Sequence, residues 1–124
     1  RFATLSPVPG LRRWAESTGH EVDTSADGLR RLTACYLLTA KRGGEPLDPV
    51  ARFHLRNGAR LEQIDVGGDP SPRGLAQSYG VLVNYLYDPD TLAANHEAYV
   101  HEGRVAHSPA VAALLGGTDE TGAA

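Results

Sequence analysis

The sequence predicts one domain of mixed α/β class, in which short strands alternate with helices. Its 124 residues are 41% hydrophobic and 22% charged, the composition of a single globular domain. Residues 81–87 form the strongest predicted strand because they are rich in β-branched and aromatic side chains. Elsewhere, apolar residues recur at helical spacing, and Pro follows Ser or Asp at several predicted helix starts. No internal repeat is evident.

The first third of the chain is expected to fold as a strand followed by two helices. Two prolines and a glycine after the strand remove backbone donors and force a turn. The second helix carries an apolar stripe at Leu29, Leu32, Cys35 or Tyr36, and Thr39, which predicts a buried face. In order, the expected elements are a strand over 2–5, a turn over 6–10, a helix over 11–16, a loop over 17–25 and a helix over 27–42.

The rest of the chain is marked by cap and turn residues. Asp48 and Pro49 predict a helix start, because the aspartate can accept from free backbone N–H groups and proline suits the first helical position. Ser71, Asp88 and Ser108, each followed by Pro, are expected to start further helices in the same way. The expected elements are a helix over 50–56, a strand over 60–66, a helix to 79, a central strand over 81–87, helices ending near 102 and 115, and a disordered tail over 116–124.

Charge and cysteine content narrow the class of function. The net charge is −3 and the twelve basic residues are spread along the chain, which argues against nucleic-acid binding. Three basic pairs could still meet a nucleotide phosphate, although solvated surface is the simpler interpretation: Arg12-Arg13, Arg30-Arg31 and Lys41-Arg42. One cysteine, Cys35, excludes an internal disulfide and suggests a small buried side chain. Without a membrane span or signal peptide, a cytoplasmic protein is expected.

Two side chains are candidates for chemistry, each with a structural alternative. His54 ends a predicted short helix before a turn, where it can face a cleft and exchange a proton near neutral pH or simply bond the helix end. Ser6 lies in a rigid loop after a strand, which could present an exposed hydroxyl or a helix cap. His96 and His101 are five positions apart, a poor spacing for two ligands on one helix face, so no metal site is expected.

Three segments of the sequence resemble the malonyl-CoA decarboxylase family. They occur in the family's order and are Leu5-Ser6-Pro7-Val8-Pro9-Gly10, Asp48-Pro49-Val50-Ala51-Arg52-Phe53-His54-Leu55-Arg56-Asn57-Gly58-Ala59 and Gly80-Val81-Leu82-Val83-Asn84-Tyr85-Leu86-Tyr87. The resemblance implies that residues 1–115 are the C-terminal part of a catalytic domain similar to the GNAT acetyltransferase fold, a bent sheet flanked by helices. It also implies an upstream CoA-phosphate loop and carboxylate, and an upstream helical domain that forms a homo-oligomer. The sequence is therefore expected to be a fragment.

The resemblance further implies decarboxylation of malonyl-CoA to acetyl-CoA and CO2, in fatty acid metabolism, without metal or organic cofactor. Ser6 would position the malonyl carboxylate and His54 would protonate the enolate. The implied substrate-binding residues are Asn57, Ser71, Asn84, Tyr85 and Tyr87, although core packing explains the two tyrosines equally well. Two alternatives stay open: an acyltransferase that uses the same cleft, and a non-catalytic acyl-CoA-binding fragment.

Overall fold

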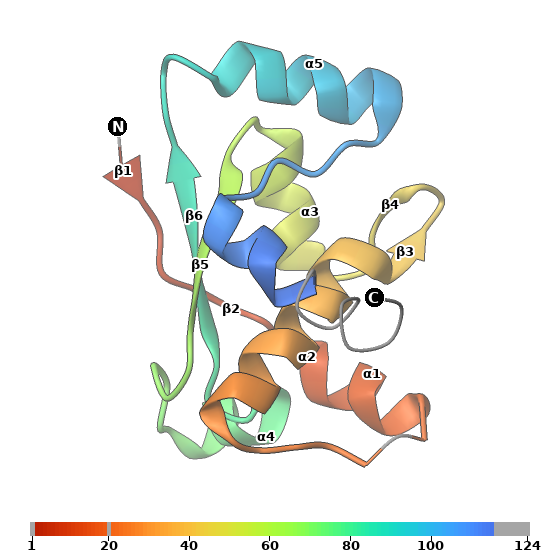
Figure 1. The fold of residues 1–124 in the computed structure, drawn as a ribbon, viewed down its shortest axis with the longest axis vertical. Helices are drawn as coiled ribbons and strands as arrows, with labels where there is room; N and C mark the ends of the chain where they lie inside the picture. The colour runs from red at the N-terminus through yellow and green to blue at the C-terminus, as the bar shows by residue number, and fades with distance from the viewer. Residues whose placement is uncertain (1, 20, 116–124) are drawn as a thin grey trace.

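A four-stranded antiparallel sheet forms one side of the molecule. The computed structural model describes residues 2–19 and 21–115, and the predicted mixed α/β class is confirmed. Strand β6 (Leu82–Tyr87) lies at the centre of the sheet. It pairs with β5 (Arg60–Asp65) on one side and with β1 (Phe2–Ala3) and β2 (Ser6–Pro7) on the other (Figure 1). The expected tail over 116–124 lies outside the described residues.

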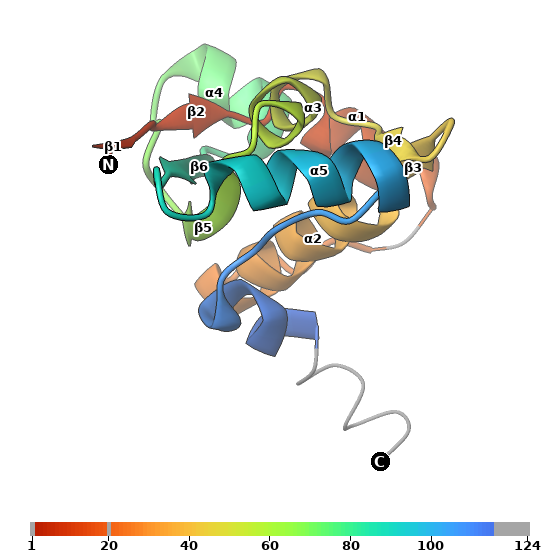
Figure 2. The same cartoon turned by 90° about the horizontal axis from the view of Figure 1, so that it is seen from above.

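The helices gather mainly on the other side of this sheet. Figures 1 and 2 show the sheet at one edge, with α5 running away from it above α3, and α4 near the end where β6 begins. A two-stranded hairpin stands apart from the main sheet. The helices are α1 (Leu11–Ser17), α2 (Ala26–Thr39), α3 (Pro49–Arg56), α4 (Pro72–Ser78), α5 (Leu92–Glu102) and a last helix over 109–115; the hairpin is β3 (Lys41–Arg42) and β4 (Glu45–Pro46).

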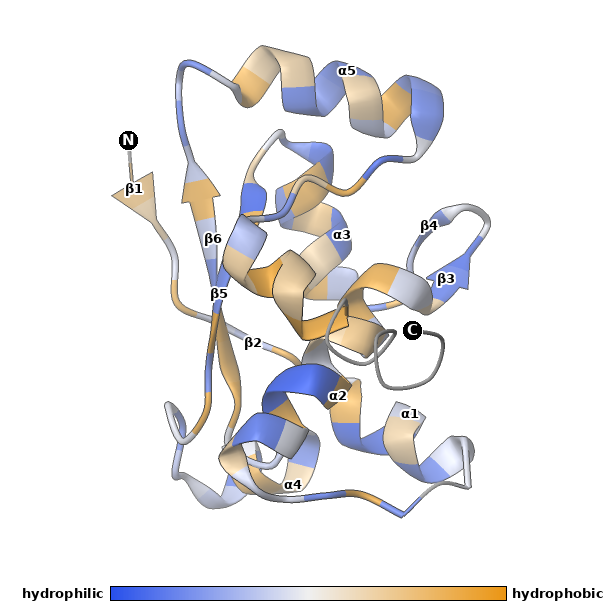
Figure 3. Cartoon of the chain, in the orientation of Figure 1, coloured by the Kyte–Doolittle hydropathy of each residue, from blue (hydrophilic) through white to orange (hydrophobic). Residues whose placement is uncertain are grey.

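Aliphatic side chains and three tyrosines, Tyr36, Tyr85 and Tyr99, form the buried core of the described chain. Hydrophobic colour follows much of β6 in Figure 3, in agreement with its prediction as the central strand. Burying such side chains supplies the main driving force for folding, about 1.5 to 3 kcal/mol for each Leu, Val or Ile. The fully buried members are Val8, Leu11, Ala34, Leu37, Ala51, Leu61, Val81, Val83 and Tyr85.

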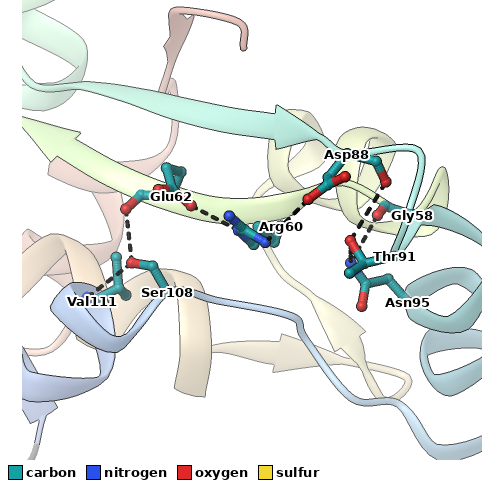
Figure 4. Close-up of polar contacts among 8 residues, drawn as sticks. All are labelled: Gly58, Arg60, Glu62, Asp88, Thr91, Asn95, Ser108 and Val111. Carbon is teal, nitrogen blue, oxygen red and sulfur yellow. Dashed lines mark hydrogen bonds and ion pairs between the residues drawn. The ribbon is translucent and has the colours of Figure 1, made fainter. Parts of the chain in front are cut away.

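Polar contacts fix the segments that surround β5. Arg60 donates to Glu62 at 2.7 Å and lies 3.8 Å from Asp88 at the end of β6 (Figure 4). The Ser108 hydroxyl donates to the Glu62 carbonyl at 2.7 Å and accepts from the Val111 N–H, which caps the 109–115 helix. The chain after α5 is therefore held along β5.

The start of the chain corrects one predicted boundary. The expected strand over 2–5 is two short strands, and Ser6 lies in β2 rather than in a turn. Between them, Thr4 donates its N–H to the Tyr85 carbonyl, so the chain stays attached to β6. Pro7 is tolerated because β2 is an edge strand, where a missing ladder donor costs little.

The end of α2 corrects a second predicted boundary, that of the helix expected over 27–42. The helix stops at Thr39, and the residues expected to extend it to 42 enter the β3–β4 hairpin instead. Gly43 and Gly44 both have positive φ, 62° and 83°, which suits the two-residue turn of a hairpin. Of the two alternatives in the predicted apolar stripe, Tyr36 is buried and Cys35 only partly buried, whereas Thr39 is exposed and its place in the stripe was wrong.

The predicted helix starts differ in their outcome. Asp48 and Ser71 both accept a backbone N–H at the N-termini of α3 and α4, as predicted, and Ser108 caps the last helix. The expectation for Asp88 was wrong: its carboxylate accepts from the Asp90 N–H in a turn, and α5 begins only at Leu92. An aspartate followed by proline suits a turn as well as a helix cap.

Candidate active site

Ser6 and His54 lie together, as the sequence predicted. Ser6 is in β2, opposite Val83 of β6, and only 6% of its surface is exposed. His54 is in the last turn of α3, and its Nε2 lies 3.2 Å from the Ser6 hydroxyl oxygen. Positioned groups of this kind are the first requirement of acid–base chemistry. The roles assigned to the two residues stay a prediction.

Tyr87 and Tyr85 hold the imidazole of His54 from two directions. The Tyr87 hydroxyl lies 2.5 Å from His54 Nδ1, on the side of the ring away from Ser6. The Tyr85 ring stacks under the imidazole, with centroids 4.5 Å apart and planes 23° apart. Phe2 in turn stacks on Tyr87 at 4.8 Å. The imidazole therefore has both nitrogens occupied and one face packed.

His54 and Tyr87 are both in their neutral forms at neutral pH when the site is free. Burial lowers the pKa of His54 below its usual value of 6.5. Burial also raises the pKa of the Tyr87 hydroxyl above its usual value of 10.0. A neutral imidazole has one N–H, and the Tyr87 hydroxyl can bond either tautomer: when the tyrosine donates to Nδ1, the proton sits on Nε2 and points at Ser6, and when it accepts, the proton sits on Nδ1.

Thr4 is a member of this site that the sequence analysis missed. Its hydroxyl oxygen lies 2.9 Å from the Ser6 hydroxyl oxygen, so either hydroxyl can donate a hydrogen bond to the other. Thr4, Ser6, His54 and Tyr87 thus form one hydrogen-bonded chain. Alternation along an extended chain places residues two apart on one face, and this signal could have identified Thr4.

The other predicted binding residues have different neighbours. The Asn84 amide donates to the Thr4 carbonyl at 3.0 Å, which satisfies a polar group in an otherwise apolar strand. Tyr85 has no exposed surface, so its contact with the site is through the stacked His54 ring. Asn57 is exposed at the end of α3 and bonds the Phe53 carbonyl. None of these contacts tests a role in substrate binding.

Ser71 lies apart from the Ser6 and His54 pair. Its hydroxyl accepts from the Gly74 N–H at 3.0 Å as the cap of α4. In Figure 1, α4 lies near the end of the sheet where β6 begins, whereas Tyr87 ends that strand. Within residues 2–19 and 21–115, no group of three or more His, Cys, Asp or Glu side chains has the arrangement of a metal site.

Asp48 ties the two segments of the site together. Its carboxylate is fully buried and accepts from the N–H groups of Ala51 in α3 and Gly10 in the loop that joins β2 to α1. The hydroxyl of Tyr36 also donates to it at 3.3 Å. Burial raises the Asp48 pKa, and these hydrogen bonds partly offset the rise. The sequence predicted the helix cap but not the bond to the loop.

Comparison with known proteins places the chain in a family. Residues 17–123 match the model of the malonyl-CoA decarboxylase C-terminal domain. The chain belongs to the malonyl-CoA decarboxylase family. It is 45% identical to the mitochondrial malonyl-CoA decarboxylase of Anser anser anser, covering 80% of this chain and 29% of that protein. The corresponding protein of Rattus norvegicus is 29% identical over 92% of this chain and 32% of its own length.

Solved malonyl-CoA decarboxylases share the fold. The protein from Rhodopseudomonas palustris aligns with a TM-score of 0.80 and 40% identity, covering 89% of this chain and 34% of that one. The protein from Agrobacterium vitis aligns with a TM-score of 0.79 and 40% identity, covering 91% and 35%. The chain therefore spans about a third of the length of these malonyl-CoA decarboxylases.

In the part of the chain that the structure describes, no helix has the length and apolar character needed to cross a membrane. The curated relatives named above are mitochondrial by their names. The expected cytoplasmic location stays a prediction.

Proposed function

We propose that this chain supplies Ser6 and His54 to the active site of a malonyl-CoA decarboxylase, which converts malonyl-CoA to acetyl-CoA and CO2. The observation that carries the proposal is the 3.2 Å contact between these two residues in a chain of this family. On this proposal, residues 1–115 are the C-terminal part of a GNAT-like catalytic domain, and an upstream helical domain forms the homo-oligomer.

The substrate itself supplies the electron sink for this reaction. When the bond between the carboxylate carbon and the α-carbon breaks, CO2 leaves and the bonding electrons pass into the thioester carbonyl as an enolate. The protein then has to hold the carboxylate out of the carbonyl plane, stabilise the enolate oxygen and supply one proton to the α-carbon. No metal or organic cofactor is needed for these steps.

Ser6 is suited to the first task and His54 to the last. The Ser6 hydroxyl can turn from Thr4 to donate to the malonyl carboxylate. A carboxylate beside His54 favours its charged form, so binding of the anionic substrate raises the pKa that burial had lowered. The imidazolium then gives its Nε2 proton to the α-carbon and returns to the neutral form, while Nδ1–H donates to Tyr87.

The decisive experiment replaces His54 by Asn in the full-length protein. Loss of a general acid should lower kcat by about a hundredfold to ten-thousandfold with little change in KM for malonyl-CoA. The matched control is His101→Asn, which alters an exposed histidine of α5 and should keep normal turnover. Near-normal kcat in His54→Asn would contradict the proposal.

The products separate decarboxylation from acyl transfer. A decarboxylase releases CO2 and forms acetyl-CoA without any acceptor, whereas an acyltransferase releases free CoA only when an amine is added. Ser6→Ala should also lower kcat. The double variant should lose less than the product of the two single losses, because both residues act on one transition state.

A further inference from the structure

A cavity lies beside α1 and the N-terminal end of α3, and three of its lining residues are arginines. The cavity has a volume of about 400 Å³, and Arg13, Arg42 and Arg52 line it from α1, β3 and α3. Trp14 and Tyr36 form its aromatic wall. No acidic side chain is among its lining residues. A volume of this size is in the range of small-ligand sites.

The three arginines lack ion-pair partners among the described residues. The ion pairs of the structure involve other arginines, such as Arg12 with Glu16 and Arg56 with Glu45. Three guanidinium groups around one small cavity repel one another, so a bound anion would lower the energy of the site. Arg13 and Arg42 are exposed and Arg52 is partly buried, and none of the three forms an ion pair with a carboxylate in the described part of the chain.

The acidic groups near this cavity are already engaged. Asp48 is buried behind Tyr36 and accepts the Tyr36 hydroxyl hydrogen bond. Glu45 bonds Arg56 and Tyr99, although its charge also interacts with Arg52. The positive potential of the cavity is therefore only partly offset.

The aromatic wall, formed by Trp14 and Tyr36, favours a ligand that also has a planar group. The rings of Trp14 and Tyr36 are 5.1 Å apart and tilted by 38°, so the indole is held against a buried ring while part of it stays accessible. A planar group can stack on such an indole. Guanidinium groups match phosphate oxygens in bidentate geometry.

We propose that this cavity binds an anion that carries both a phosphate and a planar aromatic base, the chemical class of a nucleotide. This ligand could be a free nucleotide or the nucleotide portion of a CoA thioester, and only the second possibility rests on the proposed function. Arg52 and His54 are two positions apart on α3, about 200° around the helix. The cavity and the Ser6–His54 pair therefore lie on different sides of α3.

The chain contains one tryptophan, so its fluorescence reports on this cavity directly. Titration with ADP should change the Trp14 fluorescence saturably. The variants Arg13→Gln, Arg42→Gln and Arg52→Gln should each weaken ADP binding by about tenfold or more, because each removes a charged phosphate donor. Calorimetry of Trp14→Phe, which keeps a stacking ring, should still detect binding.

The matched control is Arg73→Gln, which removes an exposed arginine of α4 without an ion-pair partner in the described chain. This variant should bind ADP like the wild type. Absence of saturable ADP binding in the full-length protein, or an equal loss of affinity in Arg73→Gln, would overturn the proposal. Because binding is measured without turnover, a catalytically inactive protein leaves this test intact.

Competition identifies the source of the ligand. If the nucleotide portion of CoA occupies the cavity, CoA should displace ADP, and Arg42→Gln should raise KM for malonyl-CoA while kcat stays unchanged. If the ligand is a free nucleotide, ADP should bind with the same Kd when CoA is saturating. Either result supports a nucleotide site, because both require the same three arginines.

Discussion

The Tyr87 hydroxyl and His54 Nδ1 lie 2.5 Å apart, and this contact joins the end of β6 to the last turn of α3. A tyrosine hydroxyl can donate to Nδ1 when the imidazole is neutral and accept from it when the imidazole is charged. The same contact can therefore serve His54 before and after substrate binding. Tyr87 is a positioning residue for His54 on this view.

Tyr87→Phe should lower kcat by about two- to tenfold, because one hydrogen bond of about 0.5 to 1.5 kcal/mol is lost while the ring stays. Without an acceptor for Nδ1–H the imidazolium is less stable, so the pKa read from the pH dependence of kcat should fall. A merely structural tyrosine would leave that pKa unchanged. Tyr79→Phe, at the end of α4, is the control and should alter neither quantity.

Thr4→Val tests the hydrogen bond that reaches Ser6 from the opposite side. The substitution keeps the shape of the side chain but removes the hydroxyl that lies 2.9 Å from Ser6. We expect a smaller loss of kcat than in Ser6→Ala, since Thr4 acts through the serine. Steady-state kinetics of the double variant Thr4→Val, Ser6→Ala should match Ser6→Ala alone. Additive losses would show that Thr4 acts independently.

Gly10→Ala should destabilise the protein because the added Cβ would collide with one atom, the hydroxyl oxygen of Tyr36. A Cβ at position 10 would collide with the hydroxyl oxygen of Tyr36 but lie at an ordinary 3.5 Å from the Tyr36 ring carbon. Overpacking of a close-packed interior costs about 1 to 3 kcal/mol, which urea unfolding can measure. Tyr36→Phe removes the colliding atom, so the double variant should lose less stability than the sum of the single variants. Full additivity would contradict this account.

The stability of the protein should depend on His54 at mildly acid pH. Because burial lowers the folded-state pKa of His54 below 6.5, the unfolded chain binds more protons there. The contribution of His54 to stability is therefore complete above 6.5 and is lost as the pH falls from 6.5 toward the folded-state pKa. Urea unfolding across this window should show a smaller loss in His54→Asn than in the wild type. Equal losses of unfolding free energy in the two proteins would contradict the lowered pKa of His54.

Local signals explain which parts of this fold the sequence could predict. The start of α3 was predicted correctly because the cap of Asp48 and the fixed φ of Pro49 act within one helical turn. The β3–β4 hairpin was missed because strands of two residues show no alternation, so Gly43 and Gly44 read only as the end of a helix. Asp88 was misassigned because turn and cap use the same residue type.

The site depends on information that local patterns do not contain. The contact of His54 with Tyr87 requires the arrangement of α3 against β6, and the contact of Thr4 with Ser6 requires the register of β1 and β2 on β6. Family resemblance supplied the Ser6 and His54 pair, but it assigned Tyr87 to the substrate. The hydrogen bond to His54 Nδ1 suggests a different role, which only the packed structure could reveal.

The pairing of β1 and β2 with β6 also determines when the site can form during folding. Asn84 and Thr4 are bonded across 80 positions, and Ser6 meets His54 across 48. Contacts between such distant segments close large loops, and the entropy cost of closure makes topologies of this kind slow to fold. An early folding intermediate that contains only local helices cannot form the hydrogen-bonded chain of Thr4, Ser6, His54 and Tyr87. Recovery of activity after dilution from denaturant should therefore coincide with completion of the sheet. Activity then serves as a probe of whether the polypeptide has reached its native topology.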